Sequence, residues 1–243
     1  MTGAADGMFV DVVTLGKVTA AFTSRSGGVS VGDWKGLNLG LSVGDAEENV
    51  RANRGLVAEA LGLRALAGMR QVHGIDLVEV VADADGGGSV IEPQCDAITS
   101  AIPGIGLLAL TADCLPVAFS CGPRVAVAHA GWRGLSAGVL EHVVSRMKSV
   151  YGCEDDVCAA IGPAAGPCCY EVSAEVIRAF AGEVIHDGRM LDLAATAKLR
   201  LMSSGVAQVA TVSACTICDR RFYSHRRDGS STGRQGVIAW LNN

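Results

Sequence analysis

Three short segments of the sequence each hold one residue that could bind a transition metal. They span residues 70–74 (RQVHG), 111–116 (TADCLP) and 129–134 (HAGWRG), and they contribute His73, Cys114 and His129. Zinc binds imidazole nitrogen and thiolate sulfur well, and a site with three protein ligands keeps its fourth position for water, as catalytic sites do. Zinc lowers the pKa of that water, which then acts as a nucleophile near neutral pH. Asp113, next to Cys114, is a candidate to accept the proton or to orient the water.

A second part of the sequence, nearer the C-terminus, favours the binding of an anion. Residues 219–234 contain five arginines among glycines and serines, a composition that allows a loop to fold onto a phosphate. The arginines of this segment are Arg220, Arg221, Arg226, Arg227 and Arg234, and Arg25, Arg51 and Arg133 are further candidates. The alternative is a solvated hairpin. The helix predicted over 134–150 has its N-terminus near Gly131 to Gly134, where it would add free N–H groups and the positive end of its dipole.

The other cysteines do not predict a second site. The chain has nine cysteines, an odd number, and its start lacks the basic and apolar segments of a secretory signal. We therefore expect a reducing cytoplasm and free thiols rather than a disulfide framework. Cys215 and Cys218 form a CxxC motif, but the adjacent pair Cys168–Cys169 lacks the spacing of a zinc ribbon. We expect these cysteines to be buried structural thiols rather than a zinc ribbon or a thioredoxin-type redox motif.

Alternating strands and helices would position these residues. Aliphatic and β-branched runs predict strands within 9–22 and over 77–81, 105–112, 115–119, 125–128, 157–161, 206–212 and 237–241. Helices are predicted over 45–63, 134–150, 173–180 and 191–204, and a turn over 83–89. Asp45 and Glu48 would form a capping box, Ser173 would cap the third helix, and Gly205 would end the fourth. Some strands follow one another directly, which indicates α/β with mixed sheets.

Composition and charge exclude several classes of protein. The chain of 243 residues is 49% hydrophobic and 19% charged and contains no long linker, so we expect one globular domain over 1–243. A net charge of −5 gives no basic bias towards nucleic acid, and we expect no such partner. The most apolar stretch, 104–121, is interrupted by Asp113 and Pro116, whereas a membrane span needs about 20 apolar residues. We therefore expect a cytoplasmic protein with no membrane association.

The three segments resemble those of the laccase-domain proteins. This family is also called polyphenol oxidase-like proteins or purine nucleoside phosphorylases, and some members are described as peptidoglycan editing factors. The resemblance runs nearly end to end, through residues 22–30, 36–40, 49–51, 53–54, 161–163, 168–172, 215–218, 224–226 and 233–235. His225 stands where the family usually has tyrosine, which puts in doubt any role of the ring there. Ala164 and Ala165 are also less typical.

The resemblance implies a fold and an activity. The fold is a single α/β domain with two mixed β-sheets packed between helices, an α/β/β/α sandwich. A catalytic zinc would lie on His73, Cys114 and His129, with Asp113 beside it. The implied reaction is phosphorolysis of adenosine, inosine and S-methyl-5′-thioadenosine, together with deamination of adenosine. The residues we expect to contact the nucleoside or phosphate are Asn38, Arg51, Arg133 and Arg226. Whether the chain forms a homodimer is left open.

Three other functions fit parts of the sequence. A copper-dependent polyphenol oxidase would use the same ligand types, but coupled laccase chemistry needs several copper ions and the chain has only five histidines. A cysteine hydrolase or amidase would use Cys114 as nucleophile with a histidine base, which fits peptidoglycan editing. A binding module without catalytic activity fits least well, because the site residues are too elaborate for it.

Overall fold

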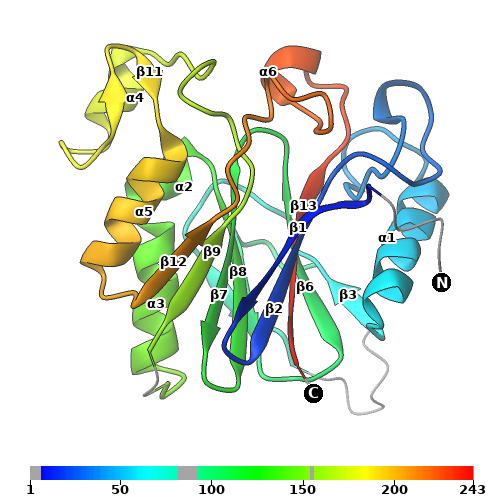
Figure 1. Cartoon of the computed structure of the whole chain (residues 1–243), viewed down its shortest axis with the longest axis horizontal. Helices are drawn as coiled ribbons and strands as arrows, with labels where there is room; N and C mark the ends of the chain where they lie inside the picture. The colour runs from blue at the N-terminus through cyan, green and yellow to red at the C-terminus, as the bar shows by residue number, and fades with distance from the viewer. Residues whose placement is uncertain (1–6, 82–91, 154–155, 243) are drawn as a thin grey trace.

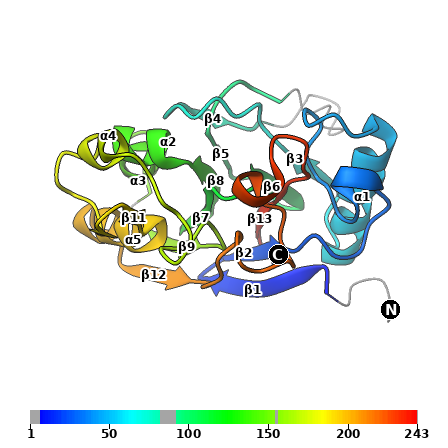
Figure 2. The same ribbon diagram turned by 90° about the horizontal axis from the view of Figure 1, so that it is seen from above.

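Two mixed β-sheets form the centre of this computed structural model, which describes residues 7–81, 92–153 and 156–242 (Figures 1 and 2). The five-stranded sheet has the order β1 (Phe9–Leu15), β2 (Val18–Thr23), β13 (Gln235–Leu241), β6 (Ile105–Thr111), β3 (Ala65–Ala67). The six-stranded sheet has the order β12 (Gln208–Thr211), β9 (Cys158–Ile161), β7 (Leu115–Cys121), β8 (Arg124–Ala130), β5 (Ala97–Ser100), β4 (Leu77–Glu79). The pairs β3–β6, β4–β5 and β9–β12 are parallel, and the other pairs are antiparallel.

Helices cover the outer faces of the two sheets. Helix α1 (Glu47–Leu61) lies on the five-stranded sheet, and α2 (Trp132–Ala137), α3 (Val139–Ser149) and α5 (Leu193–Ser203) lie on the six-stranded one (Figure 2). The short elements α4 (Ala174–Arg178), β10 (His186–Asp187), β11 (Met190–Leu191), α6 (His225–Asp228) and the 3₁₀ turn Gly32–Trp34 complete the chain. These layers confirm the α/β/β/α sandwich with two mixed sheets.

Alternating side chains fill the spaces between the layers. Successive residues of a strand point to opposite faces of its sheet. Leu107 therefore packs between the two sheets while Leu108 packs under α1. In β7, Ala118 faces the other sheet and Phe119 faces the helices. Strands β6 and β7 are thus buried on both faces, which explains why each is a continuous apolar run in the sequence.

The predicted strands are confirmed with small shifts, and the helix predicted over 45–63 is confirmed as α1, but its predicted capping box and the single helix over 134–150 are wrong. Helix α1 has Ala46 as its N-cap, with no side-chain cap, because the Asp45 carboxylate accepts hydrogen bonds from Ser30 Oγ (2.6 Å) and Asn38 Nδ2 (2.9 Å) instead. The helix predicted over 134–150 is two helices, since Gly138 adopts a φ of 95° between them. The cap at Ser173 is confirmed. The predicted turn over 83–89 lies outside the described residues.

One cysteine prediction is also wrong. Cys121, at the end of β7, forms a disulfide with Cys153, which follows α3, and the Cα atoms lie 6.0 Å apart. The sequence pattern did not indicate this pair, because the two residues become neighbours only when α3 packs along the sheet. The other seven cysteines are free.

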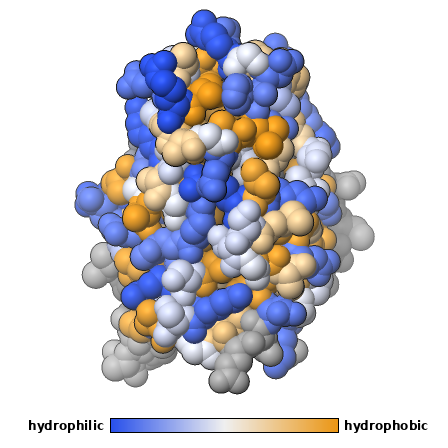
Figure 3. Space-filling view, turned by 90° about the vertical axis from the view of Figure 1, so that its left-hand side faces the viewer, coloured by the Kyte–Doolittle hydropathy of each residue, from blue (hydrophilic) through white to orange (hydrophobic). Residues whose placement is uncertain are grey.

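The surface of the helical layer shows no single continuous apolar area in Figure 3, which views the side that carries α3, α4 and α5. Hydrophilic residues are interspersed there with hydrophobic ones. Among the residues that the structure describes, no helix is both long and apolar enough to cross a membrane.

Candidate metal centre

His73, Cys114 and His129 lie together at one edge of the six-stranded sheet. Their ligand atoms lie within 4.8 Å of one another, and the two imidazole rings meet edge to face with centroids 4.8 Å apart. His129 is the next-to-last residue of β8, and Cys114 immediately precedes β7, its antiparallel partner. His73 lies on the connection between β3 and β4. His129 is buried and His73 is exposed, so the cluster is fixed on one side and open on the other.

A buried carboxylate, Asp96, organises this cluster. It precedes β5, which pairs with β8, and this pairing brings it beside His129. Nδ1 of His129 donates to Oδ1 of Asp96 at 2.8 Å, which leaves Nε2 of His129 free for a metal. Asp96 also accepts the backbone N–H groups of Val72 (3.1 Å), His73 (2.9 Å) and Gly74 (2.7 Å). One side chain therefore holds two of the three ligands.

Our reading of the sequence missed Asp96. Its signal in the sequence is weak: an acidic residue directly before the buried strand Ala97–Ser100, with no local motif around it. Its completely buried carboxylate is the feature that marks it, and burial is visible only in the structure.

Two residues of the site have an unusual backbone conformation. His73 has a φ of 62° and Asp113 a φ of 89°, a region that residues other than glycine rarely adopt. Such conformations cost about 1–3 kcal/mol each and cluster at functional sites, where surrounding contacts hold them. At His73, the hydrogen bonds to Asp96 hold the backbone in this conformation. At Asp113, the contacts of its own side chain hold the backbone.

The Asp113 carboxylate binds the C-terminal segment. Oδ1 accepts the hydroxyl of Thr216 at 2.7 Å, while Oδ2 accepts the hydroxyl of Ser224 at 3.0 Å and the backbone N–H of Arg226 at 2.7 Å. The Asp113 side chain is buried, and both of its oxygens have partners within the protein. This arrangement favours a positioning role over the role of proton acceptor considered from the sequence.

Gly131 leaves the space that the ligands occupy. A Cβ atom at this position would lie 2.9 Å from Sγ of Cys114 and 3.0 Å from Cδ2 of His73. Any residue with a side chain would therefore displace two of the three ligands. This close approach explains the glycine in the HAGWRG segment.

Cys114 and His129 form an ion pair in the protein without metal. Burial opposes ionisation of Cys114, but the charge of His129 and hydrogen bonds with His129 and His73 lower the pKa of the thiol to about 6. Burial likewise opposes protonation of His129, but Cys114 and Asp96 raise the pKa of the imidazole to about 9. Cys114 is thus a thiolate at neutral pH, the form that binds metals and attacks electrophiles.

The cluster fits a catalytic metal site. Two imidazoles and one thiolate converge, a carboxylate orients one imidazole, and a glycine keeps the space open. Nitrogen and sulfur ligands in this number are those of catalytic zinc sites, although copper binds the same ligand types.

The cluster lies in a cavity of about 500 Å³. This volume is within the range of small-molecule sites. His73, Cys114, His129, Asp113, Arg133 and Arg226 line it, as expected from the sequence. Arg70, Arg234, Tyr170 and His225 line it as well. Burial raises the pKa of Tyr170 to about 12, so its hydroxyl keeps its proton at neutral pH.

Two expected contact residues lie elsewhere. Arg51 is on the exposed face of α1, where it pairs with Glu47. Asn38 is buried beneath the cavity wall, and its side-chain oxygen accepts the backbone N–H of Arg234 at 2.9 Å. Neither is among the residues that line the cavity. Asn38 therefore supports Arg234.

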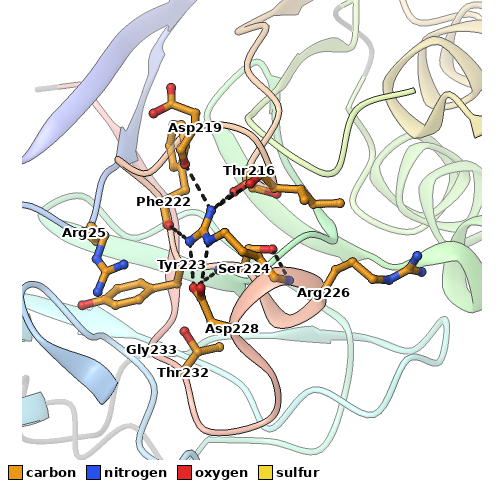
Figure 4. A network of polar contacts seen from close by, with 12 residues as sticks. Arg25, Thr216, Asp219, Phe222, Tyr223, Ser224, Arg226, Asp228, Thr232 and Gly233 are labelled. Carbon is orange, nitrogen blue, oxygen red and sulfur yellow. Dashed lines mark hydrogen bonds and ion pairs between the residues drawn. The ribbon is translucent and has the colours of Figure 1, made fainter. Parts of the chain in front are cut away.

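The arginines of segment 219–234 divide into three groups. Arg226 and Arg234 line the cavity. Arg227 instead holds its own segment in shape, because its guanidinium donates to the backbone oxygens of Thr216 (2.8 Å) and Phe222 (2.7 Å) and pairs with Asp228 (2.7 Å) (Figure 4). Arg220 and Arg221 are exposed, and Arg221 pairs with Asp219.

The prediction of buried thiols at the CxxC motif is wrong. Cys168 and Cys218 are exposed, and Cys169 and Cys215 are partly exposed. The Sγ atoms of these four cysteines lie within 4.8 Å of one another.

Most of the chain is similar to known proteins. A family model described as multi-copper polyphenol oxidoreductase laccase matches residues 19–242. A Pseudomonas aeruginosa protein named purine nucleoside phosphorylase is 42% identical over 239 residues, which cover 93% of this chain and 94% of the relative. A Xylella fastidiosa protein of the same name is 40% identical over 244 residues, 92% of each chain.

Solved structures share the fold. A crystal structure of a Neisseria meningitidis protein has a TM-score of 0.83 and 36% identity, covering 97% of this chain and 100% of that one. The structure of a Bacillus licheniformis protein called YfiH has a TM-score of 0.85 and 31% identity, covering 92% of both chains.

Proposed function

This chain belongs to the multi-copper polyphenol oxidoreductase laccase family, whose relatives include proteins named purine nucleoside phosphorylase, and we propose that it is a zinc-dependent purine nucleoside phosphorylase. The observation that carries the proposal is a single cavity lined both by the His73, Cys114 and His129 cluster and by several guanidinium groups. Phosphorolysis needs such a pair of sites, one for the phosphate and one beside the purine. Its substrates would be adenosine, inosine and S-methyl-5′-thioadenosine.

The arginines supply the phosphate site in this proposal. Arg133, Arg226 and Arg234 line the cavity, and guanidinium groups bind phosphate through two parallel hydrogen bonds. Arg133 stacks on Trp132 (4.4 Å) and Arg226 on Tyr170 (5.1 Å), which restricts the directions in which these guanidinium groups point. A phosphate held there would attack C1′ of the ribose, as the bond from C1′ to the purine nitrogen breaks and the departing base takes up a proton.

The cluster supplies the site for the base. His73, Cys114 and His129 would hold zinc, which supplies a Lewis acid and a bound water of lowered pKa. Asp96 orients His129, and Asp113 fixes the segment that carries Arg226. A purine over this cluster is also in the place where hydrolytic deamination of adenosine would occur, and we propose that as a side activity.

Phosphate dependence tests the proposal. Protein loaded with zinc is incubated with adenosine or inosine, with and without phosphate, and the products are separated by chromatography. We expect adenine or hypoxanthine only when phosphate is present, and inosine from adenosine without phosphate. Arg226→Gln should raise the KM for phosphate, whereas Arg220→Gln, an exposed arginine outside the cavity, should not. Absence of both products from the zinc-loaded protein would refute the proposal.

The Cys114–His129 ion pair favours one second candidate. A thiolate beside an imidazolium is also the arrangement of a cysteine nucleophile in hydrolases. Cys114→Ala separates the two functions. If the variant loses both its zinc and its phosphorolysis activity, Cys114 acts as a metal ligand. If the variant keeps its zinc but loses amide hydrolysis, Cys114 acts as a nucleophile.

The small number of clustered histidines disfavours multi-copper oxidation. All five histidines lie in the described part of the chain, and only His73 and His129 belong to a cluster of metal-ligating side chains there. His142 lies on α3 and His186 on β10, outside the cavity. Copper-loaded protein given a phenol should therefore show no oxygen consumption.

A further inference from the structure

We propose that Cys168, Cys169, Cys215 and Cys218 bind a second zinc ion, which has a structural role and joins two loops of the cavity wall. These residues come from two segments that are far apart in the sequence. Cys215 and Cys218 have the CxxC spacing of a zinc site, but the adjacent pair Cys168–Cys169 does not. The structure brings the two pairs to one place, with all four Sγ atoms within 4.8 Å of one another.

The topology of the sheet explains why the pairs meet. Strands β9 and β12 are parallel neighbours, so the chain leaves both strands at the same edge of the sheet. The two segments then run side by side. Ala164 forms a parallel bridge with Cys215, and the backbone N–H of Thr216 donates to the oxygen of Ala164 at 2.9 Å. Cys215 itself belongs to this bridge, and the other three cysteines follow it within a few residues.

The distances suit a metal with four thiolate ligands. Sulfur atoms at about 2.3 Å from a tetrahedral zinc lie about 3.8 Å from one another. Sγ of Cys218 lies 2.8 Å from that of Cys169 and 3.4 Å from that of Cys168, so small shifts of side chains would open the space for the ion. None of the four forms a disulfide, although Cys121 and Cys153 do.

The backbone is also arranged to support a thiolate. The N–H of Gly166 donates to Sγ of Cys215 at 3.3 Å. A Cβ atom on Gly166 would lie only 3.1 Å from Cβ of Cys215, so glycine permits this approach. Hydrogen bonds to ligand atoms are the usual outer shell of metal sites. The exposure of Cys168 and Cys218 gives the ion a path from solvent.

The cluster is connected to the catalytic cavity. Thr216, inside the CxxC motif, donates to the carboxylate of Asp113, and the N–H of Ala165 donates to the backbone oxygen of Asp113 at 2.8 Å. Tyr170, which follows Cys169, lines the cavity. A zinc ion on the four cysteines would therefore fix both loops against Asp113. The ion is fully coordinated by protein, so its role is structural rather than catalytic.

Metal analysis of the full chain tests the proposal. Protein is purified with a reductant and zinc, dialysed, and its zinc measured by mass spectrometry. We expect about two zinc ions per chain for the wild type and about one for the double variant Cys168→Ser/Cys218→Ser. The double variant His73→Ala/His129→Ala should also keep about one. Cys158→Ser, a free cysteine in neither cluster, is the matched control and should keep both.

Alkylation gives a second measurement that needs no variant. Cys168 and Cys218 are exposed, yet zinc should protect them from iodoacetamide until a chelator is added. One zinc per wild-type chain, lost only in the histidine variant, would overturn the proposal. So would a disulfide among the four cysteines of the reduced protein, or equal alkylation of Cys168 and Cys218 before and after chelation.

Discussion

Asp96→Asn is the substitution that best tests the account of the metal centre. The two carboxylate oxygens of Asp96 accept four N–H groups, those of Val72, His73, Gly74 and His129. Asparagine keeps one oxygen and replaces the other by an N–H₂ donor, so two of the four N–H groups lose their acceptor in either orientation of the amide. A buried donor without a partner costs about 1–3 kcal/mol, which predicts a loss of about 2–6 kcal/mol in the free energy of unfolding.

The same change should weaken zinc binding. Oδ1 of Asp96 accepts from the His73 backbone and the His129 ring, and Oδ2 accepts from the backbones of Val72 and Gly74, so asparagine keeps only one of these two sets. It therefore either releases the ring of His129 or loosens the backbone on both sides of His73. Loss of such an outer-shell partner typically lowers metal affinity about 10–100-fold. The removed charge should also lower the pKa of His129 in the metal-free protein, because Asp96 is one of the groups that raise it.

Two measurements check this prediction. Urea denaturation of the metal-free protein gives the free energy of unfolding, and competition with a chromophoric chelator gives the zinc affinity. Asp187→Asn, an exposed aspartate on β10, is the matched control and should change neither quantity. Wild-type zinc affinity in Asp96→Asn, together with a loss of stability below about 0.5 kcal/mol, would refute the reasoning.

Three further predictions concern space, protons and a buried hydroxyl. Gly131→Ala should lower zinc affinity about tenfold or more, because the new Cβ would lie 2.9 Å from Sγ of Cys114 and metal sites tolerate displacements of only about 0.5 Å. Gly55→Ala, in open space on α1, should leave zinc binding unchanged and stabilise the fold by about 0.5–1 kcal/mol in the same assays. In the metal-free protein, the pKa of His129 is about 9 and the pKa of Cys114 is about 6, so between these pH values His129 is protonated and Cys114 is not. Zinc binding between these pH values should therefore expel about one proton from this pair, fewer above the range and more below it; calorimetry in buffers of different ionisation enthalpy measures this, and a pH-independent release would contradict the ion pair. Tyr223→Phe removes a hydroxyl that donates to a backbone oxygen at 2.9 Å; we expect a loss of about 1 kcal/mol by urea denaturation, and an unchanged midpoint would show that this bond contributes nothing.

The sequence by itself determined the types of residue available for chemistry and the class of fold. Histidine and cysteine in segments 70–74, 111–116 and 129–134 define the donor atoms, because ligand chemistry depends on residue type. Continuous apolar runs such as 105–112 and 115–119 predict strands buried on both faces, and this is where β6 and β7 lie. These features are local, so a short window of sequence contains them.

Only the tertiary structure decided which of these residues work together. Asp96 reaches His129 through the pairing of β5 with β8, and the two cysteine pairs meet because β9 and β12 are parallel neighbours. The pairing of strands that are distant in the sequence gives no local signal in the sequence of either strand. The sequence likewise did not predict the direction of each arginine side chain. Arg226 and Arg227 are adjacent in the sequence, yet Arg226 lines the cavity and Arg227 binds backbone oxygens of its own segment. Residue types follow from the sequence, but their partners depend on which strands lie side by side.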